Sequence, residues 1–391
     1  MKSLKKICSE KILILASVNK EKFFVIKDDA NPDTYDLISQ MQGQKVKVFS
    51  LRESSENFHD ENDSKKLKKF YVVWQKGEEE TVIYAEEILF DGFAGSSYNI
   101  AYQLSSLGAT NVSLAAFVDD SNTTETLIEE CKENGIDFIS LYASNIGITY
   151  ALKTDGSYDP LLCMEKPGII DCTINRHKLD EEWDAIIASS VPDNLEVLQL
   201  ILDIFSRNER AVKVVIPSMR LINSRNPQIT RLFMQILRRC SVLQMNHMEA
   251  SEFLKVRSVS FNINEKSAEQ LIWDFEKLIK IPVIIITEGK YGAAVVIETE
   301  DGNEFIYQKS IPLVRELANT TGSGDGFTGG FSRTFIQIYK KHSKKAIALA
   351  ARIGAEVAML VTGSYGGNLS QDPEKRLTIE RMLEIFDNFR K

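Results

Sequence analysis

The chain has 391 residues, a formal net charge of −8 and an apolar fraction of 43%. This composition predicts a globular protein of one large or two smaller domains and argues against a general nucleic-acid or anionic-membrane surface. The five cysteines show no C-x-x-C spacing, so neither a zinc site nor a disulfide framework is indicated and a reduced, cytoplasmic setting is expected.

The first predicted element is a buried β-strand around residues 12–15. Its apolar run is short, and Glu10 and Lys11 separate it from the basic start of the chain, which is not the pattern of a signal peptide. No stretch reaches the roughly 18 apolar residues of a membrane span. We therefore expect a protein without a membrane segment.

Short apolar strands and amphipathic helices alternate through most of the chain. Strands are predicted near 112–118, 184–190, 212–217, 241–246 and 282–289, and helices near 97–108, 124–135, 195–208 and 228–239. This alternation predicts an α/β fold with a doubly wound, mainly parallel sheet over residues 11–391. The active site of such a sheet lies at the carboxyl ends of its strands.

Two segments interrupt the alternation. Residues 21–92 and 146–172 contain alternating apolar and polar runs with little helical character, and are predicted to form antiparallel strands outside the main sheet. The economical interpretation is a small β-rich lid made of two separated pieces. Within the first piece, residues 30–70 include a polar insertion of mixed charge.

The stretch NTTGSGDGFTGGF, residues 319–331, is predicted to be a glycine loop that leads into a helix, because apolar residues recur every three or four positions after Phe327. A helix N-terminus attracts anions, and Gly322 and Gly324 allow a close approach of the backbone. Asp325 would repel a phosphate unless it accepts a proton. The alternative is that Asp325 only caps the helix.

A second glycine turn, AGSSYN, precedes the helix predicted near 97–108. Gly95 would let a hydroxylated substrate approach the backbone, and the Asn99 amide both donates and accepts hydrogen bonds. The alternative is ordinary helix capping by Ser96 or Ser97.

Two further turns follow predicted strands. In QMNHMEASEF, Asn246 and Glu249 are three residues apart, which suits a water-mediated contact with magnesium or, alternatively, a capping pair at the surface. In TEGKYG, the residues Thr287, Gly289 and Gly292 could lie beside a nucleotide, although most such turns are tight connections between strands.

Taken in order, these four turns on one α/β chain resemble the ribokinase (PfkB-type carbohydrate kinase) family, from Lys11 to about Leu369 and apart from the insertion near 30–70. The resemblance implies a ribokinase-like three-layer core with a β lid, and an ATP- and Mg²⁺-dependent kinase that phosphorylates a hydroxyl of a sugar or nucleoside. It assigns Asp325 as general base and the backbone of Gly322, Ser323 and Gly324 as anion hole. It further assigns Asn19, Glu21, Gly95 and Asn99 to the substrate, Asn246, Thr287, Gly289 and Gly292 to the nucleotide, Glu249 to magnesium through water, and Asn319 and Thr321 to a monovalent cation such as K⁺.

The sequence also departs from the family pattern. Glu21 stands where many members have an aspartate that holds sugar hydroxyls, and Ala94 replaces the first glycine of the substrate turn. Residues 216–218 read Ile-Pro-Ser in place of Asp-Pro-Asn. Asn319 replaces an aspartate near the monovalent-cation site, which leaves potassium activation open, and Ala351 replaces an asparagine of the penultimate helix. These changes affect substrate identity more than reaction class.

Three readings of the function stay open. A sugar kinase is expected first. An adenosine-type nucleoside kinase would need aromatic side chains such as Phe23, Phe24 or Tyr150 towards a base. A non-catalytic binding protein on the same fold is the third. A dinucleotide-dependent oxidoreductase is excluded, since no G-x-G-x-x-G follows the first strand.

Two further expectations concern partners. A phosphosugar substrate would need an added cation, for which Lys20 and Lys22 are the candidates. The lid sheet could pair with a second copy of the chain to form a homodimer.

Overall fold

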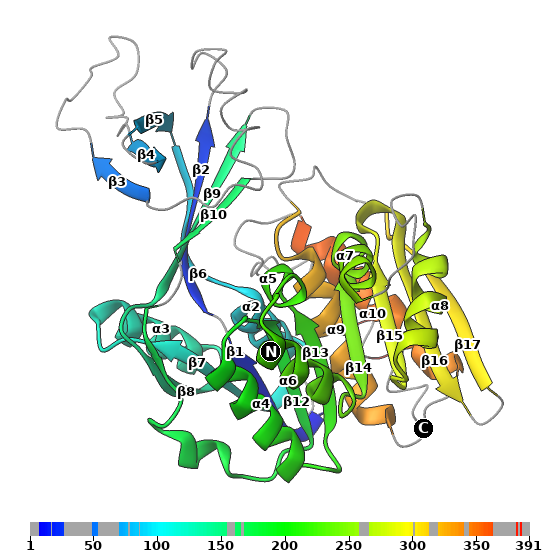
Figure 1. Cartoon of the computed structure of the whole chain (residues 1–391). Helices are drawn as coiled ribbons and strands as arrows, with labels where there is room; N and C mark the ends of the chain where they lie inside the picture. Colours follow the sequence, from blue (N-terminus) through cyan, green and yellow to red (C-terminus); the bar gives the residue numbers. More distant parts are fainter. Residues whose placement is uncertain are drawn as a thin grey trace.

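The computed structural model describes residues 8–16, 18–26, 49–53, 70–76, 79–85, 87–154, 161–165, 168–257, 266–299, 302–312, 320–339, 344–362, 381 and 384. A ten-stranded sheet forms the centre of the molecule (Figure 1), in the order β11-β8-β7-β1-β12-β13-β14-β15-β16-β17. Seven neighbouring strands of this sheet, from β8 to β15, run parallel, whereas β11, β16 and β17 run antiparallel to their neighbours. The predicted α/β class with a mainly parallel sheet is confirmed.

The parallel strands are short and apolar because both of their faces are buried. Their bounds are β1 Cys8–Ala16, β7 Ala109–Val118, β8 Ile136–Ala143, β12 Ala185–Val191, β13 Val212–Pro217, β14 Val242–Asn246 and β15 Val283–Thr287. The antiparallel strands are β11 Ile170–Asp171, β16 Gly292–Thr299 and β17 Gly302–Lys309. In β1, Ile12 and Ile14 belong to one core, and Leu13 and Leu15 to the core on the other face, as the two-residue period of a strand requires.

Helices cover both faces of the sheet and give three layers. One core contains side chains of α2 (Ser96–Ser106), α3 (Asn122–Glu133), α9 (Ser323–Ile338) and α10 (Lys344–Thr362). The other contains side chains of α4 (Leu195–Arg207), α5 (Met219–Ile222), α6 (Pro227–Leu237), α7 (His247–Arg257) and α8 (Ala268–Leu278). Two 3₁₀ turns, η1 (Arg176–Leu179) and η2 (Gly289–Tyr291), lie in connections. None of the helices described is long and apolar enough to cross a membrane.

Seven of the strands described lie outside the main sheet. A four-stranded sheet, in the order β10-β9-β2-β6, contains β2 (Asn19–Ile26), β6 (Glu87–Ala94), β9 (Gly147–Thr154) and β10 (Leu161–Glu165). A separate three-stranded sheet contains β3 (Phe49–Glu53), β4 (Phe70–Lys76) and β5 (Glu79–Ala85). Figure 1 shows the four-stranded sheet projecting from the α/β body, with β6 leading directly into α2. That this sheet acts as a lid stays a prediction.

Three details of the predicted lid are corrected. Residues 170–171, expected outside the main sheet, form β11 at its edge and pair with β8. The contact between the two lid segments is parallel, since β2 and β9 run in the same direction, whereas antiparallel strands were expected. The strands β3, β4 and β5 form a sheet of their own. Pairing partners of short strands depend on contacts between distant segments, which the local pattern does not encode. Most of the polar insertion at 30–70 lies outside the described residues.

Candidate active site

The predicted site residues that the structure describes meet at the carboxyl edge of the main sheet, where β1, β12, β14 and β15 end. Strand β2 begins three residues after β1 and carries Asn19 and Glu21, while α2 begins directly after β6. Asn246 and Thr287 are paired residues at the ends of β14 and β15. The N-termini of α2 and α9 complete this edge. Segments from five parts of the chain are thus brought together.

Asp325 lies in the first turn of α9, whose N-cap is Gly322 in a left-handed conformation (φ 80°), with no side chain capping the helix. The alternative that Asp325 is the N-cap is therefore wrong. The first intrahelical bond runs from Gly326 N–H to the Gly322 carbonyl (2.8 Å), so the N–H groups before it lie outside the helical ladder. Of these, Ser323 N–H closes a turn onto the Thr320 carbonyl (3.2 Å). A Cβ added at Gly324 would meet only open space.

Two side chains of α2 hold the Asp325 carboxylate from opposite ends. Ser96 donates its hydroxyl to Oδ1, and Asn99 Nδ2 donates to Oδ2 at 2.8 Å. The N-cap of α2 is Gly95 (φ 102°), again without a side-chain cap. Ser97 instead donates to the Leu15 carbonyl (3.1 Å). Neither Ser96 nor Ser97 therefore caps α2. Ser96 and Asn99 instead orient the Asp325 carboxylate.

Burial raises the pKa of Asp325, and the bonds from Ser96 and Asn99 lower it in part. Desolvation disfavours a charged carboxylate, whereas hydrogen-bond donors favour it. The result is a carboxylate that is both oriented and a stronger base than an exposed aspartate. This combination is typical of a group that accepts a proton near neutral pH.

Two residues at this site were missed in the sequence. The Ser189 hydroxyl, fully buried near the end of β12, shares a hydrogen bond with the Ser96 hydroxyl and so extends the chain of contacts to Asp325. Gln244, in the middle of β14, donates Nε2 to the Gly324 carbonyl (3.2 Å). A single serine or glutamine in an apolar strand gives no spacing signal. Only the position of Ser189 near the carboxyl end of β12 could have pointed to it.

Close packing fixes α2 against α9. A Cβ at Gly329 would lie 2.9 Å from Gln103 Cβ, so this position of α9 requires glycine to let α2 approach. Further along, the fully buried Arg333 donates Nε to the Leu107 carbonyl (3.1 Å) just after α2 ends. These contacts set the positions from which Ser96 and Asn99 reach Asp325.

Glu21 is the second carboxylate of the site. It lies in β2, is 4% exposed, and its Oε1 has no hydrogen-bond partner among the described residues. Burial and the neighbouring charge of Asp325 raise its pKa to about 7. Lys20 precedes it in the strand and therefore faces the opposite side, where its Nζ pairs with Asp91 (2.9 Å). Lys20 is thus engaged away from Glu21, which does not favour the expected role for it beside a phosphosugar.

Asn246 and Glu249 form a reciprocal pair at the start of α7. Asn246 N–H donates to Glu249 Oε2 (2.9 Å), and Glu249 N–H donates to Asn246 Oδ1 (2.8 Å), so the capping alternative is observed. Burial and the charge of Asp325 raise the pKa of Glu249 to about 7, against the bond from Asn246. Because the charge of Asp325 raises the pKa of Glu249, the two carboxylates form a region to which a cation would be attracted.

No group of three His, Cys, Asp or Glu side chains among the described residues could hold a metal by itself. Magnesium suits such a site, because it usually takes one or two carboxylates and completes its shell with water and substrate phosphates. The donor set around Glu249 and Asp325 therefore fits magnesium bound together with a nucleotide.

The TEGKYG segment connects the antiparallel strands β15 and β16 through η2. The expected tight connection is thus observed, and it places Thr287 and Gly289 at the carboxyl edge beside Asn246. Gly292 has φ 125°, and a Cβ there would lie 2.0 Å from the Gln308 carbonyl oxygen, so only glycine fits. This geometry neither requires nor opposes a nucleotide.

The remaining positions named from the sequence lie partly outside the described residues. Asn319 lies outside the described residues, as do the side chains of Lys22, Phe23, Phe24 and Tyr150. Thr321 lies in the turn before α9. Ser218 is the N-cap of α5, and its hydroxyl also donates to the Val191 carbonyl (2.7 Å). Ala351 is fully buried in α10, which argues against a contact with adenine from that position.

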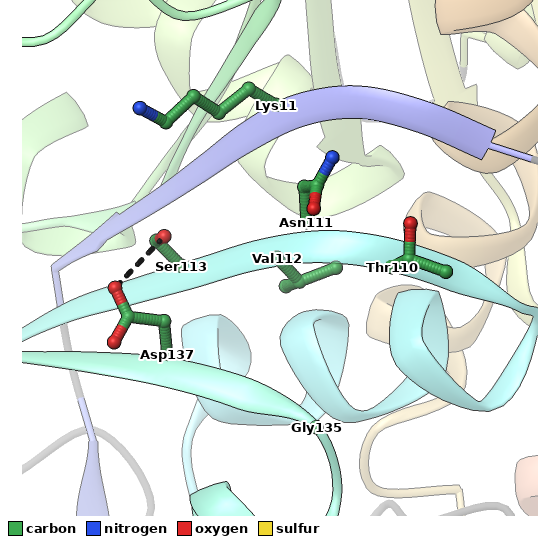
Figure 2. A pocket seen from close by; sticks show the side chains of 7 residues that line it. All are labelled: Lys11, Thr110, Asn111, Val112, Ser113, Gly135 and Asp137. Carbon is green, nitrogen blue, oxygen red and sulfur yellow. Dashed lines mark hydrogen bonds between the residues drawn. The ribbon is translucent and has the colours of Figure 1, made fainter.

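A hollow of about 400 Å³ lies at the opposite, amino edge of the sheet, where β1, β7 and β8 begin. Figure 2 shows Lys11, Asn111 and Ser113 beside it, with the Ser113 hydroxyl donating to Asp137 (3.5 Å). Its lining contains none of the predicted site residues. The hollow and Asp325 therefore lie at opposite ends of the strands.

Comparison with known proteins agrees with this arrangement. The model of the pfkB family carbohydrate kinase matches residues 69–374. The chain belongs to this family. The match includes the α2 turn, the Asn246–Glu249 pair and the Asp325 loop of this pfkB family chain. A comparison with curated proteins found no matching sequence.

Solved structures show the same fold at low identity. Ribokinase from Giardia lamblia aligns with a TM-score of 0.63 and 15% identity, over 97% of this chain and 100% of that one. Ribokinase from Cryptococcus neoformans var. grubii in complex with ADP gives 0.59 and 16%, over 96% and 99%. Burkholderia thailandensis nucleoside kinase in complex with inosine gives 0.57 and 15%, over 96% and 97%. The expected resemblance to the ribokinase family is confirmed.

Proposed function

We propose that this pfkB family chain is an ATP-dependent kinase that transfers the γ-phosphoryl group to a hydroxyl of a small sugar-like substrate. The observation that carries the proposal is Asp325. It lies in the first turn of α9, its pKa is raised by burial, and Ser96 and Asn99 orient its two oxygens. A carboxylate placed in an anion-attracting helix end fits a group that meets both a hydroxyl and a phosphate.

In this proposal Asp325 acts as general base. Each of its oxygens has already accepted one hydrogen bond, and a carboxylate oxygen has a second lone pair free to accept the substrate hydroxyl proton. The raised pKa brings the base closer to the working pH and so favours proton transfer.

The anion hole consists of the backbone N–H groups of Gly322, Ser323 and Gly324, supported by the partial positive charge of the helix end. Because Ser323 N–H already donates to the Thr320 carbonyl, we expect Gly322 N–H and Gly324 N–H to reach the anion first. The open space beside Gly324 supports this role.

The substrate side is proposed at Asn19, Glu21, Gly95 and Asn99. Glu21 Oε1 and Asn99 Oδ1 are buried acceptors without partners among the described residues. A buried acceptor left unpaired costs free energy, and a ligand with hydroxyl donors removes that cost. Two unpaired hydrogen-bond acceptors beside the base favour a substrate that carries several hydroxyl groups.

A nucleoside kinase is the second candidate, since a ribose carries the same hydroxyls as a free sugar. One structural neighbour is a nucleoside kinase in complex with inosine. In this reading an aromatic side chain such as Phe23, Phe24 or Tyr150, on the paired strands β2 and β9, would face the base. A non-catalytic binding protein is the third candidate. Turnover with any substrate would exclude it, and the absence of turnover would favour it.

We propose that the nucleotide binds beside Asn246, Thr287, Gly289 and Gly292, with magnesium held through water by Glu249. Magnesium would neutralise phosphate charge there. A monovalent cation near Asn319 and Thr321 is part of the same proposal.

We also propose a homodimer through the four-stranded sheet. The cytoplasmic setting is supported by Cys131, Cys172 and Cys240, which are free and buried.

The test is substrate-dependent ADP release from Mg-ATP over a panel of pentoses, hexoses, their phosphates and nucleosides, with and without potassium. Turnover with one compound, lost in Asp325→Asn, is the expected result and identifies the substrate class. Silence across the panel, in folded protein shown to bind ATP, would overturn the catalytic proposal in favour of the binding-protein reading.

A further inference from the structure

A second hollow, of about 450 Å³, lies at the amino edge of the main sheet, beneath the ends of α4, α6 and α8. Its size falls within the usual range of small-molecule sites, roughly 300–1,000 Å³. It is separate from the site around Asp325, because β13, β14 and β15 begin here and end there. The charged side chains of its lining are Glu209, Arg210, Lys213, Arg238, Arg239 and Lys280.

The charge at this hollow is strongly unbalanced. Five of its lining side chains are cationic and one, Glu209, is anionic, while Lys280 also pairs with Glu276 on α8. Cations near helix C-termini commonly serve the helix dipole, which amounts to roughly half a negative charge per helix. The ends of α4, α6 and α8 together supply about one and a half negative charges, and Glu209 and Glu276 supply two more. The five cations therefore exceed the negative charge around them by more than one unit. The helix ends do not account for the whole cluster.

Lys213 is the least expected member of the cluster. It lies in β13, is 5% exposed, and its Nζ donates to the Glu209 carbonyl (3.0 Å). Burial lowers the pKa of Lys213, and the charge of Arg239 lowers it further, against the opposite influence of Glu209. An ammonium has three N–H donors, so this bond uses only one of them. A buried cation beside an arginine is a costly arrangement that an anion would relieve.

The hollow in Figure 2 offers a comparison on the same edge of the sheet. Its lining has one cation, Lys11, whose Nζ pairs with Glu181, and one carboxylate, Asp137. A hollow of similar size therefore need not gather cations at this edge. The cluster around Lys213 is specific to its place in the fold.

We propose that the Lys213 hollow is a binding site for a small phosphate-bearing molecule. Arginine guanidinium groups bind phosphate oxygens in a bidentate manner, and three arginines with two lysines match a group of two or more negative charges. Tyr339, directly after the last residue of α9, also lines the hollow. An occupant would therefore contact the end of the helix whose first turn carries Asp325. This proposal is independent of the kinase activity proposed above.

The test is isothermal titration with inorganic pyrophosphate at fixed ionic strength, with inorganic phosphate as a second probe. The wild-type chain is compared with the double variant Arg210→Ser/Arg239→Ser. Both arginines are exposed, so the double variant is expected to fold, which its circular dichroism and thermal midpoint will check. The control is Arg225→Ser/Arg231→Ser, which removes the same charge from exposed positions outside the hollow.

The expected result is at least about a tenfold loss of pyrophosphate affinity in the Arg210/Arg239 variant and none in the control. Pyrophosphate bound at the Asp325 loop would persist in both variants as a separate equivalent. Weaker binding of phosphate than of pyrophosphate would indicate an occupant with more than one phosphoryl group, and equal binding a single phosphate. Equal affinity in all three proteins, an equal loss in both variants, or no binding to the wild type would overturn the proposal.

Discussion

The carboxyl edge of the main sheet gathers three carboxylates, Glu21, Glu249 and Asp325, whereas the amino edge beneath α4, α6 and α8 gathers arginines and lysines. Both Glu249 and Asp325 lie in the first turn of a helix. Four of the five cations lie within three residues after a helix end, namely Arg210, Arg238, Arg239 and Lys280. The direction of the strands and helices in an α/β layer thus separates charge. Burial raises the pKa of the three carboxylates at the carboxyl edge and lowers the pKa of Lys213 at the amino edge.

The largest expected effect concerns Asp325. Asp325→Asn keeps the side chain's shape but removes the base, so we expect kcat to fall on the order of 10²–10⁴-fold. Nucleotide affinity should change little, because the backbone of the loop is retained. Steady-state kinetics and ATP binding measure the two effects. Asp203→Asn, which removes a carboxylate on α4 that pairs with Arg176, is the control and should retain full turnover.

The next effect distinguishes two adjacent serines at the same edge. Ser96→Ala removes a donor to Asp325, a bond worth about 1.5–3 kcal/mol when the acceptor is charged. Because this bond lowers the pKa of Asp325, its loss should move the acid limb of the pH–rate profile up by about one unit or more. Ser97→Ala, which loses a bond to the Leu15 carbonyl, should leave the limb in place. Equal shifts in both variants would contradict the orienting role of Ser96.

A smaller effect concerns the free energy of unfolding. The folded pKa of Glu21, about 7, lies above its ordinary value of 4.5, so the folded state holds a proton that the unfolded state releases between these values. Stability is therefore lost as the pH rises from 4.5 through 7. Glu21→Gln should unfold with a free energy on the order of 1–2 kcal/mol higher than wild type at pH 8.5 and about the same near pH 4, below the unfolded pKa.

Denaturant unfolding at the two pH values measures this difference. Glu129→Gln, at an exposed position of α3, is the control and should show no pH-dependent gain. A Glu21→Gln variant with the same difference from wild type at both pH values would show that Glu21 is not protonated in the folded chain.

The smallest effect is expected at the amino edge. Asp137→Asn, beside the hollow in Figure 2, loses only a long bond to Ser113 (3.5 Å) and lies at an exposed position. We expect turnover to stay unchanged and the free energy of unfolding to change by no more than about 0.5 kcal/mol. Thermal unfolding and kinetics check both. A large loss of turnover would mean that the two edges are functionally coupled through this hollow.

Much of the candidate site could be predicted from the sequence because each of its turns is local. Asp325, Asn99 and Glu249 each follow a small or polar turn at a helix start, and such a signal spans only a few residues. The contact between Ser96 and Ser189 joins positions 93 residues apart, and that between Gln244 and Gly324 joins positions 80 apart. Neither pair leaves a local pattern, so neither was predicted.

The glycines of the GSGDGFTGG stretch show the same limit. Gly322 and Gly324 were predicted to serve a ligand, on the basis of their place before a helix. The structure shows that Gly326 and Gly330 allow α10 to approach α9, and that Gly329 allows α2 to approach, since an added Cβ at each would meet atoms at 3.0 Å or less. One stretch thus holds glycines that are predicted to serve a ligand and glycines that helix packing requires, and only the neighbouring helices identify the second group.

By itself, the sequence determined the α/β class, the order of the turns and a carboxylate in the first turn of a helix, because hydrophobic period and turn chemistry act over a few residues. The tertiary structure decided which side chains orient Asp325, how β2 pairs with β9, and where the cations around Lys213 gather. Those features depend on contacts between segments far apart in the chain, and burial at these contacts sets the pKa of the groups involved.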